Sequence, residues 1–530
     1  MRVTFVAMGC EQLGVTMLAN IARQKGHQVQ LAYSAALFHD RYNLNIPWLG
    51  RIFDDSDHVV DQIVAQRPDV IACSSLTATH RRLSEMSARA KKRLPHAKVV
   101  FGGVHPSAVP ERVLSEAHID FVCVGEGDQS FPAILRAIEQ DNLEEPIANV
   151  RHISPSGHLL TGAQVGFIQD LDSLPGYDKS LWEDHMRFDA LYMTMVGRGC
   201  PFRCTFCFNN FFAELPEGRS GKYVRLRSVD HVMNELLHAK RRYNFRFVSF
   251  EDDIFNVDKR WLKPFLERYK REIGVPFQCL THPRYMDDEC ARWMADAGCE
   301  WVQMGVQSAD TEFRNQELRR HEKSNHIERA LAAMSKHGLK VKLDHMFGLP
   351  GEPIEAQQSA LDLYEAHQPN RIQTFWTVYL PGTQMMREAL AEGRITQEDA
   401  DRINDGIDFE LYHLSGNRLS EEATSTFSAY QTYFRWLPLL PAWLRRPHPS
   451  QLRWLPNGLL EVMGLAADLL NALLTRNPDH SSYLLHYADQ LWRLLRRARG
   501  GGQSTPPVTT GSDTENPSSP SRPTLPSTVA

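Results

Sequence analysis

Three cysteines in one short loop constrain this chain more than any other feature. Cys200, Cys204 and Cys207 follow an apolar run at 191–196, which predicts a strand that passes into a loop. Thiolates gathered in this way favour a soft metal, either zinc or an iron–sulfur cluster. Structural zinc usually takes four protein ligands, and the next cysteine in the chain is Cys279. A cubane held by three thiolates keeps one iron open for chemistry, whereas three buried apolar cysteines are the less favoured alternative.

The same loop resembles the signature of the radical S-adenosylmethionine (SAM) enzymes. The resemblance rests on the spacing of the three cysteines and on Phe206 before the last of them. In that family three thiolates hold a [4Fe–4S] cluster, whose open iron binds the amino and carboxylate groups of SAM. One electron then splits SAM into methionine and a 5′-deoxyadenosyl radical. The resemblance implies that the three cysteines bind such a cluster and that Phe206 borders the adenine of SAM.

Length and composition indicate a multidomain α/β protein. A chain of 530 residues is too long for one hydrophobic core. The net charge of −5 gives no reason to expect nucleic acid. The start of the chain does not resemble a signal peptide, no apolar run has transmembrane length, and nine cysteines with three in one loop favour a reducing cytoplasm. Sequence patterns divide the chain into five parts: 1–143, 144–189, 190–383, 384–499 and 500–530.

The first part, 1–143, alternates strand and helix patterns. Strands are predicted at 3–8, 29–33, 70–73, 99–101 and 120–124, and a basic helix is predicted at 83–94. This alternation predicts a doubly wound, Rossmann-like parallel sheet whose ligands bind at the carboxyl ends of the strands. Small and polar residues follow these strands: Ser74, Ser75, Thr77, Gly102, Gly103, His105, Gly125, Glu126 and Gly127. Each glycine pair alone is explained by a turn or a helix cap, but together they predict a shelf for a large ligand.

Two segments of this part, 101–106 and 124–128, resemble the cobalamin-binding domain that precedes many radical SAM modules. The resemblance implies that cobalamin binds at these strand ends. The Asp-x-His-x-x-Gly loop that supplies a lower histidine ligand to cobalt in other cobalamin proteins is missing, because His58 follows Asp57 directly. A lower face without histidine is therefore expected. His105 is predicted as a polar contact, with a solvated loop histidine as the alternative.

The third part, 190–383, repeats a strand–helix unit after a hairpin-rich connector at 144–189. Strands are predicted at 191–196, 245–250, 277–280, 301–305, 341–347 and 372–379. Six strands with intervening helices predict a partial (β/α)6 barrel of the TIM type, with its active site at the carboxyl ends of the strands. This pattern is independent of the cysteine spacing and supports the same conclusion.

The radical SAM resemblance assigns roles at these strand ends. Glu251, Asp252 and Asp253 stand where the family often has a Gly-Gly-Glu segment that meets the SAM amino group. The glycines are absent here, so the choice among the three acids is open, and helix N-capping is the alternative for the two aspartates. Arg225 and Arg227 could pair with a carboxylate or a phosphate. Five further residues are expected around the ribose, carboxylate and adenine of SAM: Gln307, Ser308, Phe347, Gly348 and Leu349.

The fourth part, 384–499, is predicted to be helical, and the tail at 500–530 has a disordered composition. Tryptophan, leucine and arginine alternate between 436 and 455, and helices are predicted at 459–474 and 483–497. This pattern is typical either of a membrane interface or of a helical cap on the barrel.

The favoured function is a cobalamin-dependent radical SAM methyltransferase that acts on an unactivated carbon. Cyclisation or rearrangement of a carbon skeleton is the alternative reaction, and a non-catalytic cobalamin or redox sensor is the alternative class. The expected cofactors are a [4Fe–4S] cluster, SAM and cobalamin. The expected partners are an electron donor such as flavodoxin or ferredoxin and a small or lipid-like substrate, such as a polycyclic terpenoid or tetrapyrrole. A cytoplasmic enzyme with peripheral contact at the inner membrane face is expected.

Overall fold

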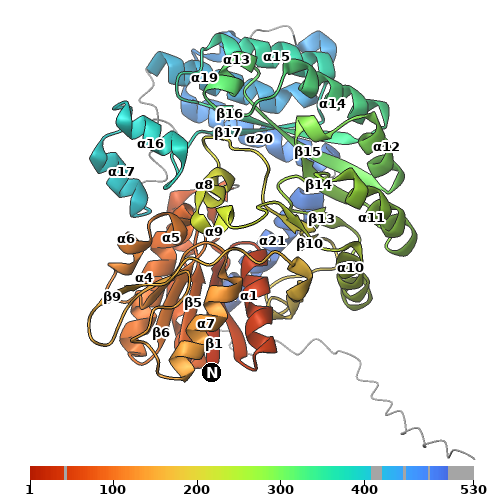
Figure 1. Ribbon diagram of the computed structural model, residues 1–530. Helices are drawn as coiled ribbons and strands as arrows, with labels where there is room; N and C mark the ends of the chain where they lie inside the picture. The colour runs from red at the N-terminus through yellow and green to blue at the C-terminus, as the bar shows by residue number, and fades with distance from the viewer. Residues whose placement is uncertain (41–43, 408–420, 446–448, 476–477, 499–530) are drawn as a thin grey trace, which may run out of the picture.

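The computed structural model describes residues 1–40, 44–407, 421–445, 449–475 and 478–498 (Figure 1). The tail predicted at 500–530 lies outside the described residues. Two sheets organise the molecule, one built by the N-terminal part and one by the cysteine-containing part. The two sheets lie one above the other in Figure 1, with helices α8 and α9 between them.

The N-terminal sheet has seven strands in the order β2-β1-β5-β6-β7-β8-β9. Their bounds are β1 (Arg2–Met8), β2 (Gln28–Ser34), β5 (Val70–Ser74), β6 (Lys98–Gly102), β7 (Phe121–Cys123), β8 (Val150–Ile153) and β9 (Leu159–Thr161). The first five strands are parallel, which confirms the doubly wound sheet. The hairpin β8–β9, assigned from sequence to the connector, extends this sheet by antiparallel pairing with β7. Sequence patterns locate a hairpin but not its distant pairing partner.

Two hydrophobic cores lie on opposite faces of this sheet because side chains alternate along each strand. In β1, Val3 and Phe5 point into one core, whereas Val6 points into the other. The covering helices are α1 (Leu13–Gln24), α7 (Gly127–Glu139), α3 (Ser56–Gln66) and α4 (Thr77–Arg93). Helix α4 begins six residues before the predicted start at 83, because its polar first turns carry no apolar periodicity.

The second sheet confirms the partial barrel. Six parallel strands follow in chain order: β10 (Tyr192–Thr194), β13 (Val248–Phe250), β14 (Phe277–Thr281), β15 (Cys299–Gln307), β16 (Lys340–Phe347) and β17 (Arg371–Trp376). The outer helices are α10 (Val229–Tyr243), α11 (Lys259–Glu272), α12 (Asp288–Asp296), α14 (Ser324–Lys336) and α15 (Glu355–His367). These helices lie outside the sheet in Figure 1.

Alternation along the barrel strands separates an apolar outer face from a polar inner face. Val302, Met304 and Leu343 belong to the core under the helices. Gln303 and Asp344, on the opposite face of neighbouring strands, are hydrogen-bonded at 2.9–3.0 Å. The barrel interior is therefore suited to polar ligands.

The C-terminal helices contact both domains. Their bounds are α16 (Gln384–Ala391), α17 (Gln397–Asn404), α19 (Glu421–Trp436), α20 (Asn457–Thr475) and α21 (Pro478–Ala498). Helix α19 packs on the barrel, where Phe434 lies in the core under the outer helices. Helix α21 reaches the N-terminal domain, where His486 lies 2.9 Å from the Tyr33 hydroxyl. This region is helical, as predicted.

Candidate functional site

The cysteine loop begins at the carboxyl end of β10. A short strand, β11 (Gly197–Arg198), pairs with β12 (Arg225–Leu226) just before the loop. Gly199 has a φ of +87°, and a Cβ there would lie 2.3 Å from the carbonyl oxygen of Tyr223. Only glycine fits this close crossing. Helix α8 (Phe208–Glu214) starts directly after Cys207, whose sulfur accepts the backbone N–H of Asn209 at 3.4 Å.

The chemistry of the three thiols fits a cationic cluster. The pKa of Cys200 and of Cys207 is raised to about 12, mainly by burial and in smaller part by the charges of Asp253 and the neighbouring thiols. Bound iron would compensate this cost, since a metal cation stabilises thiolates. Within the described ranges, no three histidine, cysteine or acidic side chains converge on the position of a single ion. A cubane binds each thiolate through a different iron and so needs a wider arrangement.

A buried charge network lies behind the loop, and the sequence analysis missed it. Arg320 donates to the carbonyl of Gly305 at 2.9 Å and to the Glu322 carboxylate at 2.9 Å. Glu322 is fully buried and also lies 3.6 Å from Arg314. The Arg320 charge lowers the pKa of Cys204 against the larger raising effect of burial. No local pattern marks these residues, because only the fold buries them next to the cysteines.

Two aromatic residues of the loop, Phe202 and Phe206, pack against different neighbours. Phe202 stacks on His282 with ring centroids 3.7 Å apart, and burial keeps the pKa of this histidine far below its usual value. Phe206 packs against an apolar cluster that includes Leu349 and Tyr379. The structure thus brings Phe206 and Leu349 together, as expected for residues around one adenine.

The three acids after β13 have different partners. Asp252 is buried and accepts the backbone N–H groups of Val196 and Gly197 at 2.9 and 2.6 Å, while burial raises its pKa to about 7. It therefore clamps the strand end before the cysteine loop and does not cap a helix. Asp253 accepts a hydrogen bond at 2.8 Å from the amide of Asn209, and Glu251 accepts one from Ser249.

The residues expected around the rest of SAM are divided between two faces. Gln307 ends β15 on the inner face with a φ of 68°, which is uncommon for a non-glycine residue. Ser308 is fully buried, and its carbonyl accepts from Arg314 at 2.6 Å. Phe347 points to the outer face, 5.7 Å from the ring of Phe434, so its side chain does not border the barrel interior. Gly348 follows with a φ of +69° and turns the chain.

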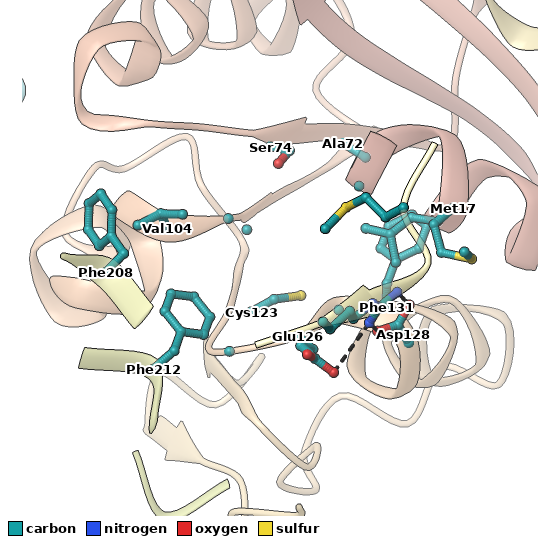
Figure 2. A pocket seen from close by; sticks show the side chains of 18 of the residues that line it. Met17, Ala72, Ser74, Val104, Cys123, Glu126, Asp128, Phe131, Phe208 and Phe212 are labelled. Atoms are coloured by element: carbon teal, nitrogen blue, oxygen red, sulfur yellow. Dashed lines mark hydrogen bonds and ion pairs between the residues drawn. The ribbon is translucent and has the colours of Figure 1, made fainter. Parts of the chain in front are cut away.

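A cavity of about 430 Å³ lies at the carboxyl edge of the N-terminal sheet. Small residues from that sheet and its loops form one side: Ala72, Ser74, Gly102, Gly103, Cys123, Gly125 and Gly127. The other side comes from the cysteine loop and its neighbours: Arg198, Gly199, Phe208, Asn209, Phe212 and Tyr223. Figure 2 shows Phe208 and Phe212 side by side at one wall, opposite Met17 and Phe131. The small side chains and aromatic walls suit a large ligand with an apolar body.

Three residues predicted at this shelf lie beneath it. Ser75, Thr77 and His105 are buried and absent from the cavity wall. His105 lies 3.2 Å from the Thr77 hydroxyl and packs on His80 with ring centroids 4.3 Å apart, and burial lowers its pKa to about 3. Both interpretations of His105, a ligand contact and a solvated loop residue, are therefore wrong in this structure. No histidine lines the described cavity.

Glu126 lines the cavity, but its carboxylate is paired across the domains. Arg225 binds it with two hydrogen bonds of 2.5 and 3.0 Å. Arg198 binds Asp128 in the same way, at 2.5 and 3.1 Å. Paired contacts of this kind fix geometry as well as adding energy. They join Glu126 and the first turn of α7 to the residues that flank the cysteine loop. A carboxylate partner for Arg225 was one of the two expectations, and Arg227 pairs with a different carboxylate, that of Glu235, at 2.6 Å.

Both sheet-containing domains match known protein families. Residues 3–135 match the B12 binding domain family, and residues 194–363 match the Radical SAM superfamily. An uncharacterized methyltransferase, PH0819, of Pyrococcus horikoshii is 24% identical over 376 residues, which cover 69% of this chain and 79% of the relative. An anaerobic magnesium-protoporphyrin IX monomethyl ester cyclase of Rubrivivax gelatinosus is 21% identical over 430 residues, which cover 78% and 72%.

The fold is also found in a solved structure. The radical S-adenosylmethionine methyltransferase TsrM from Kitasatospora setae, with cobalamin and a [4Fe–4S] cluster bound, aligns with a TM-score of 0.60. The alignment has 17% sequence identity and covers 74% of this chain and 75% of that protein. At this identity the comparison establishes a shared fold.

Proposed function

Because this chain belongs to the radical SAM enzymes that carry a cobalamin-binding domain, we propose that it methylates an unactivated carbon of its substrate. Its cofactors are a [4Fe–4S] cluster, SAM and cobalamin. When bound, the cluster and SAM supply a radical that removes hydrogen from carbon, and cobalamin supplies the methyl group. The observation that carries the proposal is the cavity whose opposite sides come from the N-terminal strand ends and from the cysteine loop.

The protein's own residues have separable roles in this proposal. Cys200, Cys204 and Cys207 bind iron, and Arg320 offsets the negative charge gathered there. Phe208 and Phe212 exclude water from the cavity wall that adjoins the loop. Low water content protects a reactive carbon centre from side reactions.

Among the three acids, we assign the SAM amino group to Asp253. Asp252 is already occupied by two backbone amides, and Glu251 by Ser249. Asp253 is exposed and is tied to Asn209, two residues after Cys207. Gln307 ends β15, which is separated from β13 by β14, and it remains the proposed partner for the polar groups of SAM because it lies on the inner face.

The test is anaerobic reconstitution with iron, sulfide, SAM and hydroxocobalamin, followed by mass spectrometry. Methyl transfer predicts 5′-deoxyadenosine, S-adenosylhomocysteine and a product heavier than its substrate by one methylene. A lipid-like substrate is proposed, and reduced flavodoxin or ferredoxin is the proposed electron donor in the cytoplasm. The variant Cys204→Ala is the control for cluster-independent products.

A cyclase is the second candidate, because the Rubrivivax cyclase aligns with 78% of this chain. Ring closure would give 5′-deoxyadenosine without S-adenosylhomocysteine and without the added methylene. A sensor would bind the cofactors but cleave no SAM. The same experiment therefore separates all three functions.

A further inference from the structure

Helix α20 exposes an apolar face that no other described part of the chain covers. From Leu459 to Leu474, the exposed positions are apolar except for Glu461. The large exposed side chains are Leu459, Val462, Leu465, Leu469, Leu470, Leu473 and Leu474, which we call the α20 face. Val462, Leu473 and Leu474 are each at least 63% exposed. Contiguous apolar surface of this kind marks an interaction site.

The inward side of the same helix is mostly small and polar. Gly464, Ala467, Asn471 and Ala472 are buried against the protein, and Leu460 is the one leucine of the helix that is buried. Asp468 pairs with Arg371 at 3.3 Å and with Arg435 at 3.4 Å. A surface helix of a water-soluble domain has the reverse arrangement, with its leucines inside. The polarity of α20 therefore indicates that its outer side faces something less polar than water.

Exposed tryptophans lie close to the α20 face. Trp454, which is 80% exposed, lies three residues before the first residue of the helix. Trp443, which is 68% exposed, lies two residues before Arg445, and Arg445 lines the same hollow as Leu474 near the other end of the helix. Indole rings prefer a boundary that is apolar on one side and wet on the other.

Described arginines lie at both ends of the α20 face. Arg453, just before the helix, lies over the ring of Trp454 at 4.8 Å and is 3.9 Å from the exposed Glu422. Arg445 lines the same hollow as Leu474 near the other end. Asp468, on the inner side of the helix, is already paired with Arg371 and Arg435. Arginines beside exposed leucines and tryptophans are complementary to a surface with negative headgroups.

We propose that the α20 face docks this enzyme on the surface of an anionic lipid bilayer, with α20 lying along the interface. By length and composition α20 could cross a membrane, but most of that helix is exposed and its inner side is fixed to the barrel. The amide of Asn471 donates to the carbonyl of Asn370 at 3.1 Å, and Asp468 keeps its two arginine partners. A spanning helix would lose these contacts in hydrocarbon.

A second copy of the chain is the less favoured occupant of this face. A two-fold dimer would bring Arg445 and Arg453 of both copies to one interface, and like charges oppose association. Lipid headgroups supply the opposite charge instead.

The test is co-sedimentation of the cluster-loaded full chain with vesicles of phosphatidylcholine, with and without phosphatidylglycerol. The variant Leu469→Ser/Leu473→Ser removes two exposed leucines one turn apart. It should weaken vesicle binding about tenfold or more, because each leucine loses its burial in the interface. Arg453→Glu should weaken binding only to the vesicles that contain phosphatidylglycerol. Ile153→Ser/Leu159→Ser, which changes two exposed apolar residues of the β8–β9 hairpin, is the matched control and should bind as the parent does.

Cleavage of SAM in solution, without vesicles, reports on folding and is expected to be unchanged in all three variants. The proposal is overturned if the parent protein binds no vesicles, or if the double leucine variant binds as well as the parent. It is also overturned if the parent sediments as a dimer that the leucine substitutions dissociate. Since no methylated product is measured, this result is independent of the proposed reaction.

Discussion

The carboxyl edge of the N-terminal sheet and the carboxyl edge of the barrel sheet offer different surroundings to a ligand. The N-terminal edge offers space, since glycine, alanine, serine and cysteine leave a cavity of about 430 Å³. The barrel edge offers charge, since Arg320 and Glu322 are buried there and Asp344 is bonded to Gln303 inside the barrel. A bulky cofactor with an apolar body needs room, whereas a zwitterionic cofactor and an iron–sulfur cluster need fixed counter-charges. The N-terminal edge thus contributes mainly space, since its acids Glu126 and Asp128 are already paired with arginines, and the barrel edge contributes buried charge.

The largest expected effect comes from replacing one of the three cysteines that bind the cluster at the barrel edge. Cys204→Ala should lower SAM cleavage by more than about 100-fold, because even the loss of an outer-shell partner of a metal site costs about 10–100-fold. Iron content and 5′-deoxyadenosine are measured, and circular dichroism checks folding. Cys10→Ser, at the exposed cysteine outside the loop, should keep both. A Cys204→Ala protein with full iron and full cleavage would contradict the assignment.

Filling the cavity tests the other edge. Ser74→Trp should weaken cobalamin binding at least about tenfold, because overpacking costs about 1–3 kcal/mol or more. SAM cleavage should remain, since the cysteine loop is unchanged. Ser74→Ala is the matched control and should bind cobalamin normally. The bound Co(II) form should show no imidazole coupling in its electron paramagnetic spectrum, and such coupling would refute a histidine-free lower face.

Removing an ion pair that joins the two domains should have a smaller effect, and this effect is on stability. Asp128→Asn should destabilise the holoenzyme by about 1–3 kcal/mol, because it leaves part of the Arg198 guanidinium unpaired at a half-buried site. Asp57→Asn, which removes a surface pair with Arg89, should change stability by less than about 1 kcal/mol. Thermal unfolding measures both. Equal effects would mean that the interdomain pair is no more important than a surface pair.

The smallest expected effect is the pH dependence of the Asp252 clamp. Burial raises its folded-state pKa to about 7 from 3.8, so the folded state holds a proton that the unfolded state has lost between these values. Its contribution to stability therefore falls as pH rises from about 4 to 7. Asp252→Asn does not titrate, so its stability relative to the parent should improve by about 1 kcal/mol between pH 6 and pH 7. A constant difference across this range would show that the carboxyl titrates normally.

Phe347 was predicted at the adenine of SAM, although its sequence position already indicated the outer face. Phe347 shares strand parity with Val341 and Leu343, and opposite parity with Lys342 and Asp344. Period-two alternation therefore already placed its side chain on the apolar outer face. The family resemblance was applied to this position without that check.

Local sequence patterns were sufficient to predict the alternation of strands and helices, the cysteine loop and the positions of the strand ends. These features follow from local periodicity and covalent spacing, which a folded chain retains. Only the tertiary structure decided that His105 lies under the shelf, that Asp252 clamps a neighbouring strand and that Arg320 lies behind the cysteines. Each of these outcomes depends on which distant groups are buried together. Burial then determines the hydrogen-bond partner and the pKa of each group, because a buried polar group can bond only with the donors and acceptors that the fold places beside it.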